Sequence, residues 1–227
     1  MSAPLNAAVF ASGSGSNFQA LLDREGKGAL WRTRLLVVDR PDTGAAQRAE
    51  RAGIPVRHIG VQDKDPRELG GETLDALQDA RADVILLAGY TRMIPPAVCA
   101  AFPKRMVNVH PALLPAFGGK GMWGSAVHKA VLAAGVRVTG VTVHFVSDRY
   151  DEGAILAQWP VPVLPSDDVP TLAARVLAVE HKLYPLAVQE LCRALAAGGQ
   201  PAPLAPPPAG FGSSSLESIT NGAFRSP

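Results

Sequence analysis

The 227-residue sequence has little cysteine and almost no excess charge of either sign. Its two cysteines, Cys99 and Cys192, lie far apart, which argues against a disulfide framework or a cysteine metal cluster and favours a reducing compartment. The 22 basic and 20 acidic residues nearly cancel, so no strong positive field is available to gather nucleic acid. No apolar run is long enough to span a bilayer, and no basic leader precedes the first one. We therefore expect a cytoplasmic protein that binds neither nucleic acid nor membrane.

Hydrophobic residues make up 47% of the chain, which is enough to bury the core of one large domain. From Gln200 onward the composition changes, because runs of proline and serine at 206–208 and 213–215 stand among few clustered apolar residues. We predict one domain over residues 1–199 and a flexible Pro/Ser-rich tail over 200–227.

Short apolar runs rich in β-forming residues alternate with segments of helical spacing. The strand candidates are Ala7–Ala11, Leu35–Asp39, Ile54–Ile59, Val84–Ala88 and Met106–Val109, and the helix candidates are 16–26, 44–53, 67–81, 95–102 and 123–134. This alternation predicts an α/β fold with a mostly parallel, twisted sheet flanked by helices, in a Rossmann-like arrangement. Two later strands, 138–146 and 154–163, predict a C-terminal antiparallel pair, and a long helix is expected over 171–197.

The segment Asn108-Val109-His110 places an amide and an imidazole two residues apart at the end of a predicted strand. Side-chain alternation puts both on one face, where they can reach one reacting centre. The pair favours acyl chemistry, with one donor for an oxyanion and one group for proton transfer. The alternative is a structural hydrogen-bonding pair. Asp151, in the turn between the last two strands, is the carboxylate expected to orient His110.

A glycine-rich loop over residues 12–17 follows the first strand and precedes a helix, so its backbone N–H groups can point at a phosphate. Its spacing matches neither the dinucleotide-binding fingerprint nor the P-loop. The alternative is a tight turn in which Ser16 or Asn17 caps the helix without a ligand. The loop and Asn108 both fall at the carboxyl ends of strands, and this shared crevice favours a phosphate monoester.

The chain resembles the folate-dependent phosphoribosylglycinamide formyltransferases over about residues 6–197. Several motifs, in the right order, carry the resemblance: Gly15-Ser16-Asn17, Leu87–Ile94, Asn108–Pro115, Thr142–Val146, Asp151-Glu152-Gly153 and Glu180-His181. The resemblance implies a Rossmann-like formyltransferase fold. It also implies that 10-formyltetrahydrofolate, as co-substrate, gives its formyl group to the glycinamide amine of 5′-phosphoribosylglycinamide in purine (IMP) biosynthesis. No metal is implied, and we expect a monomer or a homodimer.

The resemblance also implies site roles. Asn108 would bind the formyl oxygen, His110 would supply a proton or a positive charge, and Asp151 would orient His110 and help move a proton. Gly15, Ser16 and Asn17 would hold the ribonucleotide phosphate, and Glu180 would bind the glycinamide or ribose end. The folate would be bound by Arg67, Thr91, Arg92, Met93, Ile94 and Asn108, with Val146, Ser147, Asp148, Arg149 and Tyr150 closing over it.

Several of these residues have simpler structural interpretations. Glu180 reads equally well as an exposed helix carboxylate, and Arg67 as a solvated arginine at a helix start. Arg92 follows a buried strand, although an arginine that covers a sheet edge looks the same. We assign neither His144, read as a core histidine, nor His128, read as a surface residue, to catalysis. The five histidines lack the spacing of a zinc site.

The loop over residues 116–124 is glycine-rich and longer than in many relatives, and its Lys120 either meets an anion or stays in water. Just before it, the bond Leu114-Pro115 is predicted to be cis, which allows a sharp turn there.

Three other functions remain open. A formyltetrahydrofolate hydrolase shares the fold and the folate pocket, but such enzymes typically carry a regulatory domain before the first strand and a second histidine where this chain has Pro111. A transfer RNA formyltransferase is disfavoured because no basic RNA-binding domain follows. A non-catalytic folate- or nucleotide-binding homologue would not need Asn108, His110 and Asp151 together.

Overall fold

The computed structural model describes residues 3–62 and 64–204. Of the predicted tail, residues 200–204 have no regular structure, and the N–H of Leu204 donates to the carbonyl of Leu156 at 2.7 Å. The part of the tail over 205–227 lies outside the described residues.

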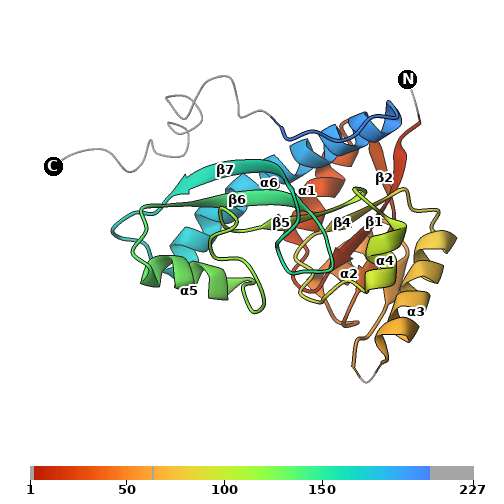
Figure 1. Cartoon of the computed structure of the whole chain (residues 1–227), viewed down its shortest axis with the longest axis horizontal. Coiled ribbons are helices and arrows are strands. Elements are labelled where there is room, and N and C mark those ends of the chain that lie inside the picture. Colours follow the sequence, from red (N-terminus) through yellow and green to blue (C-terminus); the bar gives the residue numbers. More distant parts are fainter. Residues whose placement is uncertain (1–2, 63, 205–227) are drawn as a thin grey trace.

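One seven-stranded sheet forms the centre of the molecule (Figure 1). Its order is β3-β2-β1-β4-β5-β6-β7: the first five strands are parallel, β6 pairs antiparallel with β5, and β7 pairs antiparallel with β6. This confirms the predicted α/β fold and its C-terminal antiparallel pair. The strands are β1 (Leu5–Ala11), β2 (Trp31–Val38), β3 (Val56–His58), β4 (Val84–Leu87), β5 (Met106–His110), β6 (Val138–Phe145) and β7 (Ile155–Pro162).

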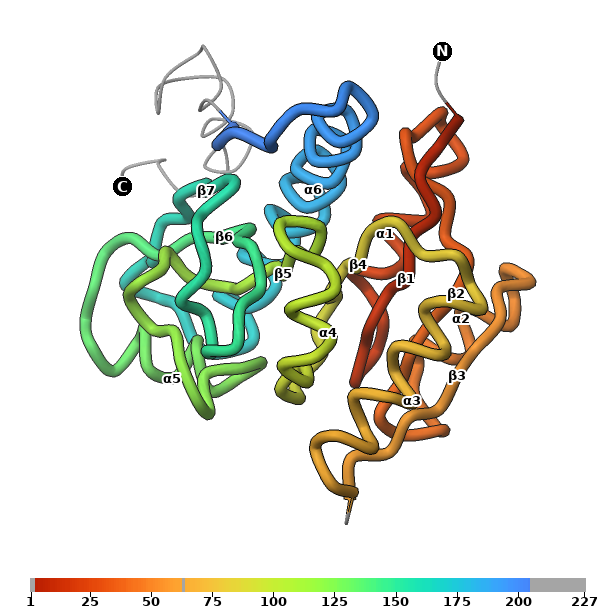
Figure 2. The backbone as a smooth tube through the Cα atoms, turned by 45° about the vertical axis from the view of Figure 1, so that its right-hand side comes forward, coloured from red at the N-terminus to blue at the C-terminus, as the bar shows by residue number. Residues whose placement is uncertain are grey.

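Helices cover both faces of this sheet because its central strands are apolar on both sides. In β1, Ala7 and Val9 join one buried cluster, whereas Ala8 and Phe10 join a second one. The first cluster includes side chains of α1 (Ser16–Glu25), α2 (Gly44–Arg51), α5 (Ser125–Ala133) and α6 (Val169–Ala196). The second includes those of α3 (Pro66–Asp79) and α4 (Pro96–Ala101), which lie side by side in Figure 2.

Local sequence sets the starts of the helices α6 and α3. The long helix α6 begins after Asp168, whose side chain accepts the N–H of Thr171 while the Thr171 hydroxyl accepts the N–H of Asp168. This capping box satisfies two backbone donors of the first turn. In α3, Asp65 accepts the N–H of Arg67, and Pro66 occupies the first helical position.

The strand β2 starts at Trp31, four residues before the predicted start at Leu35. In its first half, buried Trp31 and Thr33 alternate with exposed Arg32 and Arg34. The prediction was too short because it relied on the continuous apolar run and overlooked this alternation at the half-solvated end of the strand.

The strand order reverses between β1 and β4, and a ligand crevice is expected at the carboxyl ends of the strands beside such a point. There the N–H of Ser12, just after β1, donates to the carbonyl of Gly89, just after β4. The Ser12 hydroxyl in turn accepts the N–H of Thr91 at 3.1 Å. Residues from the glycine-rich loop and from the segment after β4 therefore meet at this edge.

Within the described residues, no helix combines the length and apolarity needed to cross a membrane.

Candidate active site

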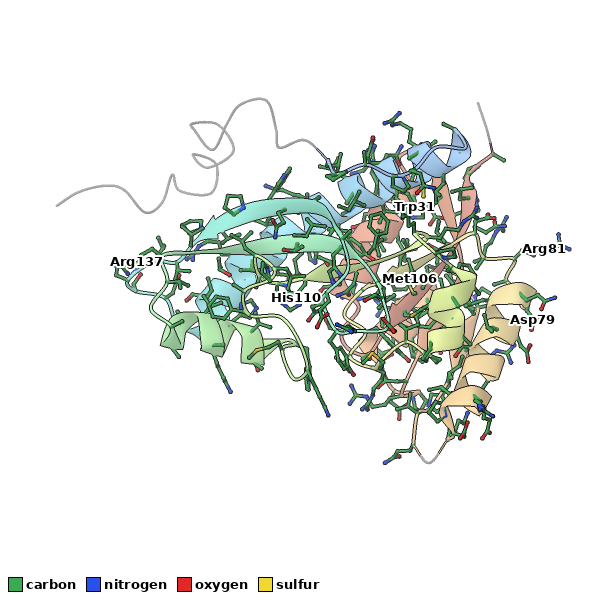
Figure 3. The ribbon with its side chains drawn as sticks, in the orientation of Figure 1. Trp31, Asp79, Arg81, Met106, His110 and Arg137 are labelled. Atoms are coloured by element: carbon green, nitrogen blue, oxygen red, sulfur yellow. The ribbon has the colours of Figure 1, made fainter. Side chains whose placement is uncertain are left out.

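Asn108 and His110 lie in the last three residues of β5, with Val109 between them. Figure 3 labels His110 and, at the other end of the strand, Met106. Val107 and Val109 point into the first buried cluster, so Asn108 and His110 lie on the opposite face of the strand. This confirms the predicted common face. The side chain of His110 is almost fully buried, with 3% of its surface exposed.

His144 holds the Asn108 amide. The two residues are directly opposite each other in the antiparallel ladder of β5 and β6. The ring nitrogen Nδ1 of His144 lies 2.9 Å from the carbonyl of Phe145, which can only accept, so Nδ1 carries the proton. In the neutral ring Nε2 is then an acceptor, and it lies 3.1 Å from Nδ2 of Asn108. One amide hydrogen of Asn108 is thus engaged, and the second remains for another acceptor.

The ring of His110 lies between two acceptors. Nε2 donates to the carbonyl of Phe117 at 2.9 Å, and Nδ1 lies 3.6 Å from Oδ2 of Asp151. Burial lowers the pKa of His110, and the charge of Asp151 and the Phe117 carbonyl only partly offset this. The neutral ring is therefore favoured, and Nδ1 is the nitrogen that can exchange a proton with Asp151.

Asp151 lies between the two histidines, as its Oδ1 is 3.5 Å from Nε2 of His144. Burial acts to raise the pKa of Asp151, but its contacts with His144 and His110 and the N–H of Gly119 together lower it. The carboxylate is therefore charged near neutral pH. The backbone of Asp151 has φ 57°, a left-handed conformation that is uncommon for residues other than glycine and that is found at functional turns.

Two backbone groups of the loop 116–124 complete this arrangement. The carbonyl of Phe117 accepts from His110, and the N–H of Gly119 donates to Oδ2 of Asp151 at 2.9 Å. Between them, a Cβ at Gly118 would lie 2.5 Å from Cδ2 of Leu114 and 3.2 Å from Cβ of Asp151. The glycine permits the loop to approach the carboxylate this closely.

The segment after His110 is fixed by Thr142 on β6 and Gln158 on β7. The Thr142 hydroxyl donates to the carbonyl of Ala112 at 2.6 Å and accepts the N–H of Leu114 at 3.0 Å. The amide of Gln158 donates to the carbonyl of Leu114 at 2.9 Å. The peptide bond Leu114-Pro115 is cis, as predicted.

In the glycine-rich loop, three successive carbonyls are turned toward the segment that follows β2. The carbonyl of Ser12 accepts from Nη2 of Arg40 at 2.6 Å, that of Gly13 from the N–H of Ala45 at 3.1 Å, and that of Ser14 from Nε of Arg48 at 3.0 Å. Among the described residues, the N–H groups of positions 13–15 have no acceptor. Together with the first N–H groups of α1, they form a cluster of donors suited to an anion.

Close packing of two helix starts requires glycine in this loop. Gly15 has φ 73°, and a Cβ there would lie 2.6 Å from Cα of Ala45. A Cβ at Gly44 would lie 2.7 Å from the carbonyl oxygen of Ser14. Gly15 itself is the N-cap of α1, and no side chain caps the helix, so the alternative interpretation, in which Ser16 or Asn17 caps it, is wrong.

Asn17 and Glu180, 163 residues apart, meet where α1 packs on α6. Nδ2 of Asn17 donates to Oε2 of Glu180 at 2.7 Å. Glu180 is 6% exposed, so its interpretation as an exposed helix carboxylate was wrong. Burial raises the pKa of Glu180 to about 7, although the Asn17 amide acts to lower it.

The segments predicted to line the folate pocket meet only in part. Ile94 is buried in the second cluster, and Val146 packs against that cluster. Arg92 donates from Nε to Asp39, which is buried, at 2.8 Å, while Met93 is 39% exposed. The other predicted residues, Thr91, Ser147, Asp148, Arg149 and Tyr150, lie in the loops after β4 and β6.

Arg67 differs from the other residues predicted to bind the folate, because it lies in the first turn of α3 and is exposed. Its side chain has no hydrogen bond or ion pair with any described residue. The structure thus gives no contact that joins Arg67 to the remaining predicted site.

Two histidine predictions need correction. His144 is 2% exposed and contacts both Asn108 and Asp151, so it belongs to the site and is more than a core residue. His128, expected at the surface, is 6% exposed on α5. The sequence carried one usable signal for His144, because pairing the predicted strands 106–109 and 138–146 as antiparallel neighbours could have placed it opposite Asn108.

The chain is similar to known proteins in sequence and in fold. A family model described as Formyl transferase matches residues 5–188. A chloroplastic phosphoribosylglycinamide formyltransferase from Vigna unguiculata is 46% identical over 187 residues, which cover 82% of this chain and 60% of that protein. The phosphoribosylglycinamide formyltransferase of Bacillus subtilis is 36% identical over 187 residues, which cover 81% of this chain and 93% of the relative.

Among solved structures, glycinamide ribonucleotide transformylase 1 from Geobacillus kaustophilus aligns with a TM-score of 0.78 and 40% identity. The alignment covers 83% of this chain and 99% of that one. The match to the Vigna protein, by contrast, spans less than two thirds of that relative's own length.

Proposed function

The chain belongs to the formyl transferase family, and from this premise we propose that it transfers the formyl group of 10-formyltetrahydrofolate to the glycinamide amine of 5′-phosphoribosylglycinamide. The Bacillus subtilis relative is named a phosphoribosylglycinamide formyltransferase, and a relative from Gallus gallus is named a trifunctional purine biosynthetic protein, which supports a role in purine biosynthesis. The main support is the set of contacts around Asn108, His110 and Asp151, joined by His144.

In the proposed reaction, the substrate amine attacks the formyl carbon, and the carbonyl oxygen gains negative charge. One hydrogen of the Asn108 amide is held by His144, so the second is left to donate to the developing oxyanion. Because the amide is held before the reaction, little reorganisation is needed when charge develops.

The carbon–nitrogen bond to the attacking amine forms and the bond to the folate nitrogen breaks, so a proton must pass from the first nitrogen to the second. Asp151 is charged and can accept that proton, and it lies beside Nδ1 of His110. His110 uses Nε2 to hold Phe117, which leaves Nδ1 to share the proton with Asp151. A protonated His110 also places a positive charge beside the oxyanion site.

The two substrates would occupy separate parts of the crevice. The donors of loop 13–15 and the start of α1 suit the ribonucleotide phosphate, and Glu180 beside Asn17 suits a polar group of the same substrate. Ile94 is buried in the second cluster and Val146 packs against that cluster, so the segments after β4 and β6 offer apolar surroundings in which a flat pterin would lie next to Asn108.

The direct test mixes purified full-length protein with both substrates and follows formylglycinamide ribonucleotide by mass spectrometry. We expect a product whose formation requires both compounds. Formate release that does not depend on the ribonucleotide would instead support the hydrolase. Tight binding of both compounds with no product would support a non-catalytic binding protein.

A further inference from the structure

A groove runs along the outer side of α1 and α6, away from Asn108 and His110. The two helices lie against each other in the fold (Figures 1 and 2). From α1 the groove is lined by residues that share one helix face, Ser16, Gln19, Ala20, Asp23 and Arg24, and Lys27 lines it just after the helix ends. From α6 it is lined by His181, Lys182, Pro185 and Leu186, and Arg48 of α2 completes it. Its volume of about 570 Å³ lies in the range of small-molecule sites.

The charges in this groove are unbalanced. Four cationic side chains, Arg24, Lys27, Arg48 and Lys182, face one carboxylate, Asp23. The part of the chain that the structure describes offers no ion pair to any of these four cations. A cleft lined by one sign of charge concentrates the electric field and attracts ions of the other sign.

Two residues that line the groove each carry a buried nitrogen atom without a hydrogen-bond partner among the described residues. These atoms are Nε of Arg24 and Nε2 of His181. Burial, then the charge of Arg48, lowers the pKa of His181, while Asp23 acts to raise it. An anion in the groove would relieve the repulsion between His181 and Arg48 and offer acceptors to the guanidinium groups.

One end of the groove reaches the glycine-rich loop. Ser16 is both the first residue of α1 and a wall of the groove, and Arg48 binds the carbonyl of Ser14 while it faces the groove. The other end is at Lys27, beyond the last turn of α1. An anion long enough to follow α1 would therefore meet phosphate donors at one end and lysine or arginine along its length.

We propose that this groove is an extended anion site, which starts at the phosphate donors of α1 and binds the oligophosphate chain of a nucleotide or a free oligophosphate with one terminal phosphate at those donors. A single phosphate at the loop cannot also contact Lys27, so the site prefers several linked phosphates over one. The consequence that such anions compete with the ribonucleotide rests on the proposed function, whereas binding itself does not.

The test uses isothermal titration calorimetry of the full-length protein with inorganic tripolyphosphate and with orthophosphate. The variant K27Q/K182Q removes two exposed cations of the groove, and K129Q/R137Q removes two exposed cations that do not line it. We expect the wild type to bind tripolyphosphate at least about tenfold more tightly than orthophosphate, with affinity that falls as salt rises. K27Q/K182Q should lose on the order of tenfold in tripolyphosphate affinity, and K129Q/R137Q should lose little.

Titrations with ATP and AMP separate the two sources. ATP that binds more tightly than tripolyphosphate assigns the site to a nucleotide, and equal affinity assigns it to the phosphate chain alone. Equal affinity for tripolyphosphate and orthophosphate, or the same loss in both double variants, would overturn the proposal. These measurements need no turnover, so their failure is separate from a failure of the formyl transfer assay.

Discussion

Nδ2 of Asn108 lies 3.1 Å from Nε2 of His144, its direct neighbour across the antiparallel ladder of β5 and β6. This contact engages one of the two amide hydrogens and thereby sets the direction of the other. The strand register thus determines where the proposed oxyanion donor points.

Replacing His144 should slow the chemical step without weakening substrate binding. For His144→Phe we expect kcat to fall about 10- to 100-fold, because the Asn108 amide is no longer held in position, while both KM values change little. His144→Gln, which keeps an acceptor, should recover part of the rate. Steady-state kinetics on both variants checks this, and equal loss in the two would argue against a hydrogen-bond role.

Removing the amide itself should cost more. Asn108→Ala should lower kcat by about 10²–10³-fold, the usual cost of one oxyanion donor. If His144 acts through Asn108, His144→Phe should lower kcat much less in the Asn108→Ala background than it does in the wild type. Additive losses in this double-mutant cycle would show that His144 has an independent role, for instance through Asp151.

Asp151→Asn should affect both turnover and the titration of His110. We expect the rate to fall by about 10²-fold or more, because a positioned proton acceptor is lost. The negative charge of Asp151 raises the pKa of His110 against the effect of burial, so the substitution should lower that pKa further. An NMR titration of the His110 ring measures this, with Glu152→Gln, which removes an exposed carboxylate nearby, as control. A His110 pKa that stays constant in Asp151→Asn would contradict the assigned contact.

The sequence predicted the elements well because their periodicity is local. The alternation of side chains along a strand predicted that Asn108 and His110 share one face. Asp151 was predicted to join them because it lies in the turn between the last two predicted strands. The role of His144 depended on strand register, which no single strand reveals. The groups from Phe117 and Gly119 are backbone atoms, so no side-chain pattern could indicate them.

Burial of helix residues was equally hard to predict. Glu180 meets Asn17 across 163 positions, and only the packing of α6 on α1 shows that its carboxyl group is inside. His128 on α5 was misplaced for the same reason, because one turn of helix does not show which face the protein covers.

Gly15 and Gly13 offer a matched pair of substitutions in the proposed phosphate loop. Gly15→Ala places a Cβ 2.6 Å from Cα of Ala45 at a φ of 73°, whereas a Cβ at Gly13 has no atom within 4 Å. We expect Gly15→Ala to lower the free energy of unfolding by about 1–2 kcal/mol or more, and Gly13→Ala to leave it nearly unchanged. Chemical denaturation measures both, and similar stability of the two variants would refute the close packing of α1 on α2.

Gly15→Ala should also weaken binding of the ribonucleotide more than that of the folate. The added Cβ forces the glycine-rich loop to move, and this displaces the N–H groups that are proposed to bind the phosphate. Calorimetry with each substrate separately tests this. Equal loss for both would indicate general misfolding of the crevice.

Glu180 should make the protein less stable as pH rises from about 4.5 to 7. Its pKa is 4.5 ordinarily and about 7 in the folded protein. Below 4.5 the group is protonated in both folded and unfolded chains, so its burial has no ionic cost. Above 4.5 the unfolded chain ionises first, and the folded state loses relative stability until pH passes 7.

The difference between these two pKa values corresponds to about 3 kcal/mol. Glu180→Gln removes the ionisation but keeps an oxygen that can accept from Asn17. We therefore expect the unfolding free energy of the wild type, relative to that of Glu180→Gln, to fall by about 3 kcal/mol between pH 4.5 and 7.5. Urea denaturation of both proteins across this range measures the difference. Two pH profiles that run parallel would show that Glu180 is ionised in the folded state, and the raised pKa would then be wrong.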